Sequence, residues 1–113
     1  MFARNVTLHL KADKAPEFTR KLETDVLPLL RKQPGFKDEI TFVATDRDEA
    51  VAISLWDRRE SAEAYSRETY PTVLQKLQEV VDGTPKVDSY EVANSTFHKV
   101  GSQSQNLNQP VGR

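Results

Sequence analysis

The chain of 113 residues contains no cysteine, which excludes disulfide bonds, thiolate metal sites and a cysteine nucleophile. Long apolar runs are also absent, since no stretch approaches the roughly 20 residues that a transmembrane helix needs. The formal net charge is only -1, which disfavours binding to nucleic acids or to anionic membranes. The first residues alternate like a strand instead of forming the apolar segment of a signal peptide. We therefore expect a cytoplasmic protein without membrane or nucleic-acid partners.

The composition predicts one small globular domain, with 37% apolar and 29% charged residues. Residues 1–100 carry all the periodic patterns and are expected to form this domain. Residues 101–113 are rich in Gln, Asn, Ser and Gly and are interpreted as a polar C-terminal tail. We expect this tail to be dispensable for the fold and, where ordered, to contact a partner subunit.

Periodicity predicts the order of the helices and strands. Apolar residues alternate along 5–10, 40–45 and 51–56, which is typical of half-buried strands. Helical spacing runs over 18–30 and again over 62–81, and a last strand is expected from Val87 to about His98. The resulting order is β-α-β-β-α-β, the ferredoxin-like α+β fold, with two helices on one face of a four-stranded antiparallel sheet.

Several residues predict where these elements begin, bend or end. Asp13 is expected to cap the first helix, and Asp57 with Glu60 resembles a capping box for the second. Pro28 should bend the first helix, and Pro71 should kink or restart the second at Tyr70. Residues 82–85, Asp-Gly-Thr-Pro, are expected to end the second helix before the last strand.

The face of the sheet that lacks helices is expected to be semi-apolar. The alternation assigns to it Thr7, Thr41, Val43 and Thr45. A sheet face of this kind usually finds a partner, so a homodimer is predicted.

Three short motifs add a family resemblance that spans about residues 2–99. They are Gln-Pro-Gly-Phe at 33–36, Leu-Trp-Asp at 55–57 and Tyr-Glu-Val at 90–92. In this order and spacing the chain resembles the antibiotic biosynthesis monooxygenase family. The resemblance implies a dimeric α+β barrel, in which two sheets meet face to face and each subunit has a cavity between sheet and helices. It also implies activities such as oxygenation without a cofactor, quinol oxidation or heme degradation.

The heme-degrading branch of that family is disfavoured residue by residue. The resemblance would require an Asn on the first strand and a Trp and a His on the second helix. Those positions hold Arg4, Tyr65 and Gln75, while Asn5 points to the other face. Without the helical His there is no evident axial ligand for iron, so no heme turnover is expected.

Three aromatic residues are the leading candidates for a ligand site between the helices and the sheet. Trp56 lies among small residues, and Tyr65 and Tyr70 are close to the break at Pro71. We interpret Tyr65 and Tyr70, with His98, as candidate catalytic groups. Substrate contacts are assigned to Trp56, Arg4 and Phe42. Packing of the aromatic residues, and an Arg4 side chain that reaches solvent at the sheet edge, are the structural alternatives.

Two functions remain open from the sequence. One is a monooxygenase that needs no cofactor and acts on a small aromatic or quinone-like molecule, with the substrate supplying the electrons for O₂. The other is a dimeric ligand-binding or stress-related module of the same fold without turnover. No metal site is predicted, because His9 and His98 lack an evident third ligand. The volume of the cavity should separate the two functions.

Overall fold

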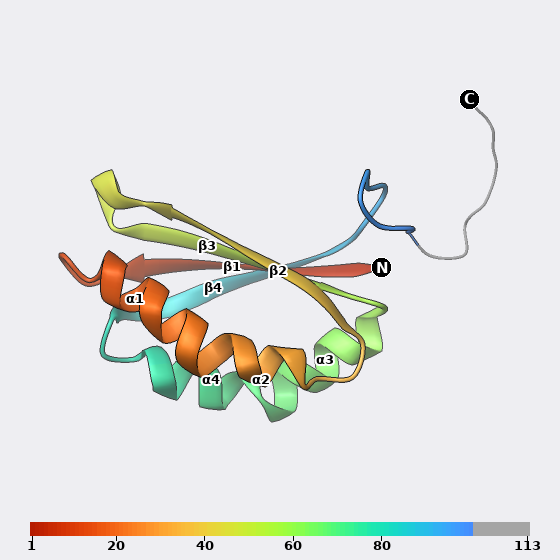
Figure 1. Ribbon diagram of the computed structural model, residues 1–113, viewed down its shortest axis with the longest axis horizontal. Coiled ribbons are helices and arrows are strands. Elements are labelled where there is room, and N and C mark those ends of the chain that lie inside the picture. Colours follow the sequence, from red (N-terminus) through yellow and green to blue (C-terminus); the bar gives the residue numbers. More distant parts are fainter. Residues whose placement is uncertain (101–113) are drawn as a thin grey trace.

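The molecule consists of two layers, a four-stranded antiparallel sheet and a set of helices on one of its faces (Figure 1). The computed structural model describes residues 1–100. The strands lie in the order β2-β3-β1-β4. The elements in chain order are β1 (Phe2–Leu10), α1 (Ala15–Lys21), η1 (Leu22–Val26), α2 (Leu27–Arg31), β2 (Phe36–Ala44), η2 (Thr45–Arg47), β3 (Glu49–Trp56), α3 (Arg59–Glu68), α4 (Tyr70–Leu77) and β4 (Val81–Glu91). The predicted ferredoxin-like fold is therefore confirmed. The predicted tail, residues 101–113, lies outside the described residues.

The first helical segment is continuous but changes its winding before Pro28. Between α1 and α2, η1 is a π-helical turn, in which the Leu27 backbone N–H donates to the carbonyl of Leu22, five residues back. Pro28 has no N–H to donate, so the backbone must adjust near it. The bend predicted from Pro28 thus takes the form of a wider turn that starts six residues earlier.

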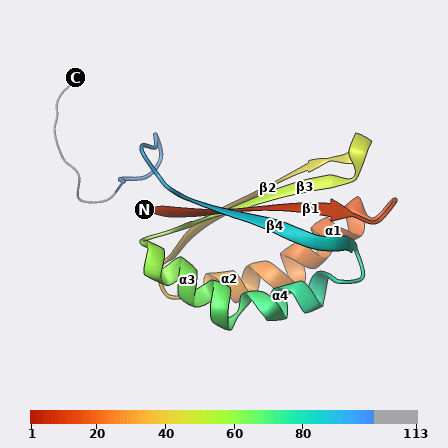
Figure 2. The ribbon, with the colours of Figure 1, turned by 180° about the vertical axis from the view of Figure 1, so that it is seen from behind.

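The second helical segment breaks at the predicted place. Helix α3 ends at Glu68, α4 begins at Tyr70, and Pro71 lies in the first turn of α4, where its missing N–H costs nothing. Seen from behind, α3 and α4 lie end to end beneath the sheet (Figure 2).

Both predicted helix caps are wrong. Asp13 has a positive φ of 63°, and Lys14 is the N-terminal flanking residue of α1. The flanking residue of α3 is Arg58, without a side-chain cap, and Asp57 lies in the preceding loop. There, the Asp57 backbone N–H donates to the carbonyl of Gly35 at 2.8 Å.

The last strand begins earlier and ends earlier than predicted. Strand β4 runs over Val81–Glu91, and residues 83–85 form a bulge opposite Leu8 of β1. Gly83 adopts a φ of 75° in this bulge, and Pro85 needs no ladder hydrogen bond there. The Gly and Pro signals therefore mark an irregularity inside the strand and not its start.

The two sides of β2 are opposite to those predicted. Phe36 pairs with Trp56, and Asp38 pairs with the next residue of β3, Leu55, so Lys37 is an extra residue in a bulge. After the bulge, Thr41 and Val43 pair with Ala52 and Ala50, whose row faces the helices. The face without helices, called here the open face, instead carries the apolar side chains Ile40, Phe42, Val51, Ile53, Leu55 and Tyr90.

The core lies between the sheet and the helices. It is formed by apolar side chains from β1, β3 and both helical segments, with Trp56 and Phe18 fully buried. Among residues 1–100, none of the helices combines the length and apolarity required to cross a bilayer. The same core contains two buried polar residues, Arg4 of β1 and Ser54 of β3, which lie opposite each other.

Candidate functional site

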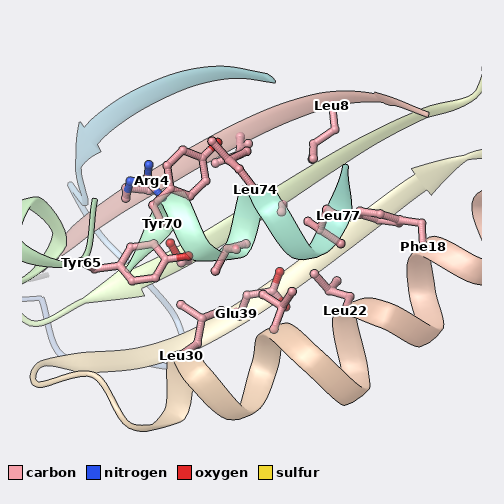
Figure 3. A pocket seen from close by; sticks show the side chains of 15 residues that line it. Arg4, Leu8, Phe18, Leu22, Leu30, Glu39, Tyr65, Tyr70, Leu74 and Leu77 are labelled. Carbon is pink, nitrogen blue, oxygen red and sulfur yellow. The ribbon is translucent and has the colours of Figure 1, made fainter. Parts of the chain in front are cut away.

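A narrow pocket opens between the sheet and the two helical segments (Figure 3). Its volume is about 50 Å³, enough for a few water molecules. Its polar lining residues are Arg4, Glu39, Ser54, Tyr65 and Tyr70. The remaining wall is apolar, formed by Val6, Leu8, Phe18, Leu22, Val26, Leu30, Ala52, Val73, Leu74 and Leu77. This is the layer in which the sequence predicted a ligand site.

Three polar residues form one row across the floor of the pocket. In the strand register, Arg4 of β1 is opposite Ser54 of β3, and Ser54 is opposite Glu39 of β2. Residues directly opposite one another share a face of the sheet. A cation and a carboxylate therefore face the helices with one small hydroxyl residue between them.

Arg4 is buried, with 4% of its surface exposed. The guanidinium carbon lies 4.4 Å from the Tyr70 ring centroid and 5.2 Å from that of Tyr65, so both rings contact the cation through their π faces. Nη2 donates to the Ser66 hydroxyl at 3.4 Å, and within residues 1–100 no carboxylate lies within ion-pair distance. The alternative that Arg4 reaches solvent is therefore wrong.

Burial changes the acidity of the groups around this cation. It lowers the pKa of Arg4 from its usual value, and the nearby tyrosines oppose the shift. Burial also raises the pKa of Tyr65 to about 12, an effect that Arg4 partly offsets. The pKa of Tyr70 is raised by burial too, against the influence of Arg4. Both phenols therefore stay protonated at neutral pH and can act as hydrogen-bond donors.

The Tyr70 hydroxyl is buried and has no hydrogen-bond partner among the described residues. The nearby guanidinium interacts with it electrostatically, but no pair of atoms meets hydrogen-bond geometry. A buried hydroxyl without a partner costs about 1–3 kcal/mol relative to a satisfied one. A ligand that accepts a hydrogen bond in this pocket would remove that cost.

Trp56 supports the pocket from behind and does not line it. The side chain is fully buried, and its indole N–H donates to the Ser54 hydroxyl at 2.9 Å. Its ring centroid lies 5.0 Å from that of Tyr65, and the Phe36 ring packs edge-on at 5.5 Å. Trp56 therefore orients two lining groups, the Ser54 hydroxyl and the Tyr65 ring.

Glu39 is the lining residue that the sequence reasoning missed. Its side chain rises from β2 into the pocket beside Leu22 and Leu30 (Figure 3). The Thr41 hydroxyl donates to its Oε2, and burial raises the pKa of the carboxyl despite this hydrogen bond. Alternation along the sequence does not reveal the bulge at Lys37. A regular strand that continued from Phe36 would turn Glu39 to the open face, whereas the bulge turns it toward the helices.

Two predicted site residues lie away from the pocket. Phe42 is on the open face and is 56% exposed. His98 follows β4, and its Nε2 pairs with the Asp38 carboxylate on that same face. His9 is at the opposite end of the sheet, next to Glu49 and Asp82 in register. The structure brings together Arg4, Tyr65 and Tyr70, with Trp56 behind them. Within residues 1–100 it gathers no set of three or more His, Asp or Glu side chains that could hold a metal ion.

Comparisons with known proteins identify the fold. No protein-family model matches the chain, and no curated protein sequence matches it. Many solved structures do match in their fold. A monooxygenase from the gene ActVA-Orf6 of Streptomyces coelicolor, solved with the ligand nanaomycin D, is similar with a TM-score of 0.70 at 16% identity. That alignment covers 87% of this chain and 92% of the other.

Two further structures show the range of proteins with this fold. SnoaB from Streptomyces nogalater, described as a cofactor-independent oxygenase, aligns with a TM-score of 0.67 at 16% identity, over 86% of this chain and 97% of the other. A protein of unknown function from Nitrosomonas europaea aligns with a TM-score of 0.71 at 13% identity, over 87% and 94%. Others are provisionally named antibiotic biosynthesis monooxygenases. At these identities the comparisons show the fold, and they confirm the resemblance stated from the sequence at that level.

Proposed function

We propose that the protein is a cofactor-independent monooxygenase that oxidises a small aromatic or quinone-like molecule in the pocket beside Arg4. The observation that carries the proposal is the buried guanidinium, which has no carboxylate partner among the described residues and faces an otherwise mostly apolar pocket. Burying a cation without a counter-charge is costly. The cost is offset if a bound anion, or an oxygen that becomes negative during a reaction, supplies that charge.

The chemistry that suits this site is oxygenation of a carbon acid. An aryl ketone whose CH₂ group is conjugated to the carbonyl through its aromatic rings loses a proton to give an enolate, which passes electrons to O₂. One oxygen atom becomes the new carbonyl oxygen, and the other leaves as water with the two hydrogens of the CH₂ group. Arg4 would bind the enolate oxygen, and the Tyr65 and Tyr70 hydroxyls would donate hydrogen bonds to it. The similarity to SnoaB, described as a cofactor-independent oxygenase, supports this assignment.

The size of the pocket requires it to widen around such a substrate. A cavity of about 50 Å³ does not hold a fused-ring molecule. Both helical walls have an interrupted hydrogen-bond ladder, at η1 before Pro28 and between α3 and α4 at Tyr70. These interruptions are the places where helix backbone can move with few lost hydrogen bonds.

The open face supports a homodimer as the working unit. Ile40 is 53% and Phe42 56% exposed, and both lie beside the apolar side chains of β3. Contiguous exposed apolar residues on a sheet commonly mark an association surface. We propose that two copies pair through their open faces, which leaves both pockets on the outer sides of the dimer.

The narrow cavity favours a second candidate, a ligand-binding module without turnover. In this function the same Arg4 pocket would bind a smaller aromatic anion without any reaction of that anion. Oxygen consumption separates the two candidates, because a binding module would take up the ligand and leave O₂ untouched.

The test uses anthrone, a tricyclic aryl ketone with an acidic CH₂ group, as the probe in air-saturated buffer. The wild type should consume O₂ and form anthraquinone faster than buffer does. Arg4→Met should lose at least about tenfold of that rate, since one stabilising group for the anion is gone. Arg67→Met is the matched control, because Arg67 is an exposed arginine of α3 outside the pocket. A wild type that binds anthrone without consuming O₂ would favour the binding module.

A further inference from the structure

We infer that Glu39 is the base of the pocket, accepting a proton from the substrate while Arg4, on the other side of Ser54, binds the anion that forms. The inference deepens the proposed function and rests on it, since it assigns the proton transfer for the same substrate. It also narrows the substrate class to aromatic molecules with an acidic C–H or O–H at one end. At the other end they carry an oxygen that takes up negative charge.

The sheet sets the separation between the two charged groups. Arg4 and Glu39 lie two strands apart in one register row, so their Cα atoms are about 10 Å apart at the usual strand spacing. Ser54, which lies between them in this row, is small, and so is Ala52 in the next row of β3. In the widened pocket a planar ring system can therefore lie over β3 with one edge toward each charged group.

Neither charged group is neutralised by another described residue. No ion pair among residues 1–100 includes the Glu39 carboxylate, and Oε2 accepts a hydrogen bond from the Thr41 hydroxyl. The other carboxylate oxygen, Oε1, remains available to a ligand. Burial raises the pKa of Glu39, which makes the carboxylate a stronger base than an exposed glutamate.

The other candidate bases do not fit this role. His98 pairs with Asp38 on the open face, so the sheet separates it from the pocket. Tyr65, with a pKa of about 12, is protonated at neutral pH and donates instead of accepting. Among the described residues that line the pocket, Glu39 is the only carboxylate.

The proton transfer is balanced without any further reagent. The Glu39 carboxylate takes H⁺ from the substrate and becomes a carboxylic acid. The electron pair of the broken C–H bond stays on the substrate and is delocalised onto its carbonyl oxygen, next to Arg4. In the absence of oxygen the step reverses, so the protein should catalyse hydrogen exchange at that carbon.

The experiment measures exchange of deuterium into the CH₂ group of anthrone in oxygen-free D₂O, followed by mass spectrometry. The wild-type protein should accelerate the exchange. Glu39→Gln keeps the shape of the side chain and an acceptor for Thr41, and it should slow the exchange by about 100-fold or more. Asp38→Asn is the matched control, since it removes a carboxylate from the adjacent residue on the open face and should exchange like the wild type.

The outcomes separate this inference from the proposed function. Exchange by E39Q at the wild-type rate, or no acceleration by the wild type, overturns the role of Glu39. Glu39→Asp retains a carboxylate and should be intermediate, so an E39D protein no faster than E39Q also contradicts it. Circular dichroism reports whether each variant is folded. If E39Q still consumes oxygen, the proposed oxygenase activity is supported and the role of Glu39 as its base is overturned. If the wild type catalyses exchange that depends on Glu39 but consumes no oxygen, the role of Glu39 is supported and the proposed oxygenase activity is contradicted.

Discussion

Each face of the sheet carries one group of side chains that is unusual for its position. The face under the helices is buried, yet it carries the polar row of Arg4, Ser54 and Glu39. The open face is accessible, yet it carries Ile40 and Phe42 more than half exposed. Buried polar groups and exposed apolar groups both cost free energy in an isolated domain.

The difference indicates where each face meets something else. Under the proposed function, a small ligand complements the polar row, since packing alone would favour apolar side chains there. Under the proposed homodimer, a second copy covers the apolar surface. If both proposals hold, substitutions on neighbouring residues of one strand should affect either ligand chemistry or association and not both.

The largest effect is expected from Trp56→Ala on the covered face. Removing this fully buried indole should lower the free energy of unfolding by about 3–5 kcal/mol. Urea unfolding followed by far-UV circular dichroism measures the change. Trp56→Phe retains an aromatic ring and should cost less. A loss below about 1 kcal/mol in W56A would contradict the role of Trp56 as the support of the pocket.

The next effect distinguishes the faces directly with two neighbouring residues of β2. Phe42→Asp should leave the fold intact and weaken dimerisation by about 30-fold or more, as for a residue at the centre of an interface. Val43→Asp puts the same charge against the core, where Val43 is partly buried, and should lower the free energy of unfolding without affecting the open face. Sedimentation equilibrium and circular dichroism give the two readouts. A wild type that is monomeric at micromolar concentration would sink the dimer proposal.

A smaller effect is expected for Glu39→Gln on the pH dependence of stability. Since burial raises the pKa of Glu39 in the folded state, the folded protein binds this proton more tightly than the unfolded chain does. Stability is therefore lost as the pH rises from the ordinary glutamate pKa through the raised one. E39Q should be the more stable protein at neutral pH, and the difference should shrink toward acid pH. Urea titrations at several pH values test the sign, and a less stable E39Q at neutral pH contradicts it.

This pH profile depends on the charges around Glu39. Arg4 approaches from β1, and Tyr65 and Tyr70 from α3 and α4. Arg31 of α2 shares an outer hollow with Glu39 and with the neighbouring Lys37 and Asp38. Comparing E39Q with the wild type in the same buffers removes the contributions that these groups make to both proteins.

The smallest change in stability is expected for Tyr70→Phe. The lost hydroxyl has no hydrogen-bond partner among the described residues, so Y70F should not be less stable than the wild type, and the free energy of unfolding should rise by about 1 kcal/mol. Binding of anthrone should weaken much more if the ligand accepts that hydrogen bond. Calorimetry on Y70F, with Y65F beside it, measures the affinity. Full affinity in both variants would mean that the two tyrosines only pack.

The sequence predicted the element order and the helix break because those features follow from local rules. Apolar spacing separates strands from helices, and the ring of Pro71 acts on its immediate neighbours. The sequence also named Arg4, Tyr65 and Tyr70 as candidate site residues, but it did not predict that the two tyrosine rings contact the Arg4 guanidinium.

The faces of β2 and the role of Glu39 could not be predicted in the same way. Ile40, Thr41, Phe42 and Val43 place apolar atoms on both sides of the strand, so alternation alone does not choose a side. The choice depends on one bulged residue, whose position is set by pairing with β3. The early start of β4 was missed for a similar reason, because Gly83 opens a bulge that only the partner strand reveals.

The bulge at Lys37 also has a consequence for how this chain tolerates changes in length. Loss of residue 37 would join Phe36 to Asp38 and leave every later partner of β2 in place. Loss of residue 41, in contrast, would move Phe42 under the helices and Val43 onto the open face if the pairing of Glu39 were kept. Related chains should therefore gain or lose a residue near position 37, and they should keep the spacing from Glu39 onward.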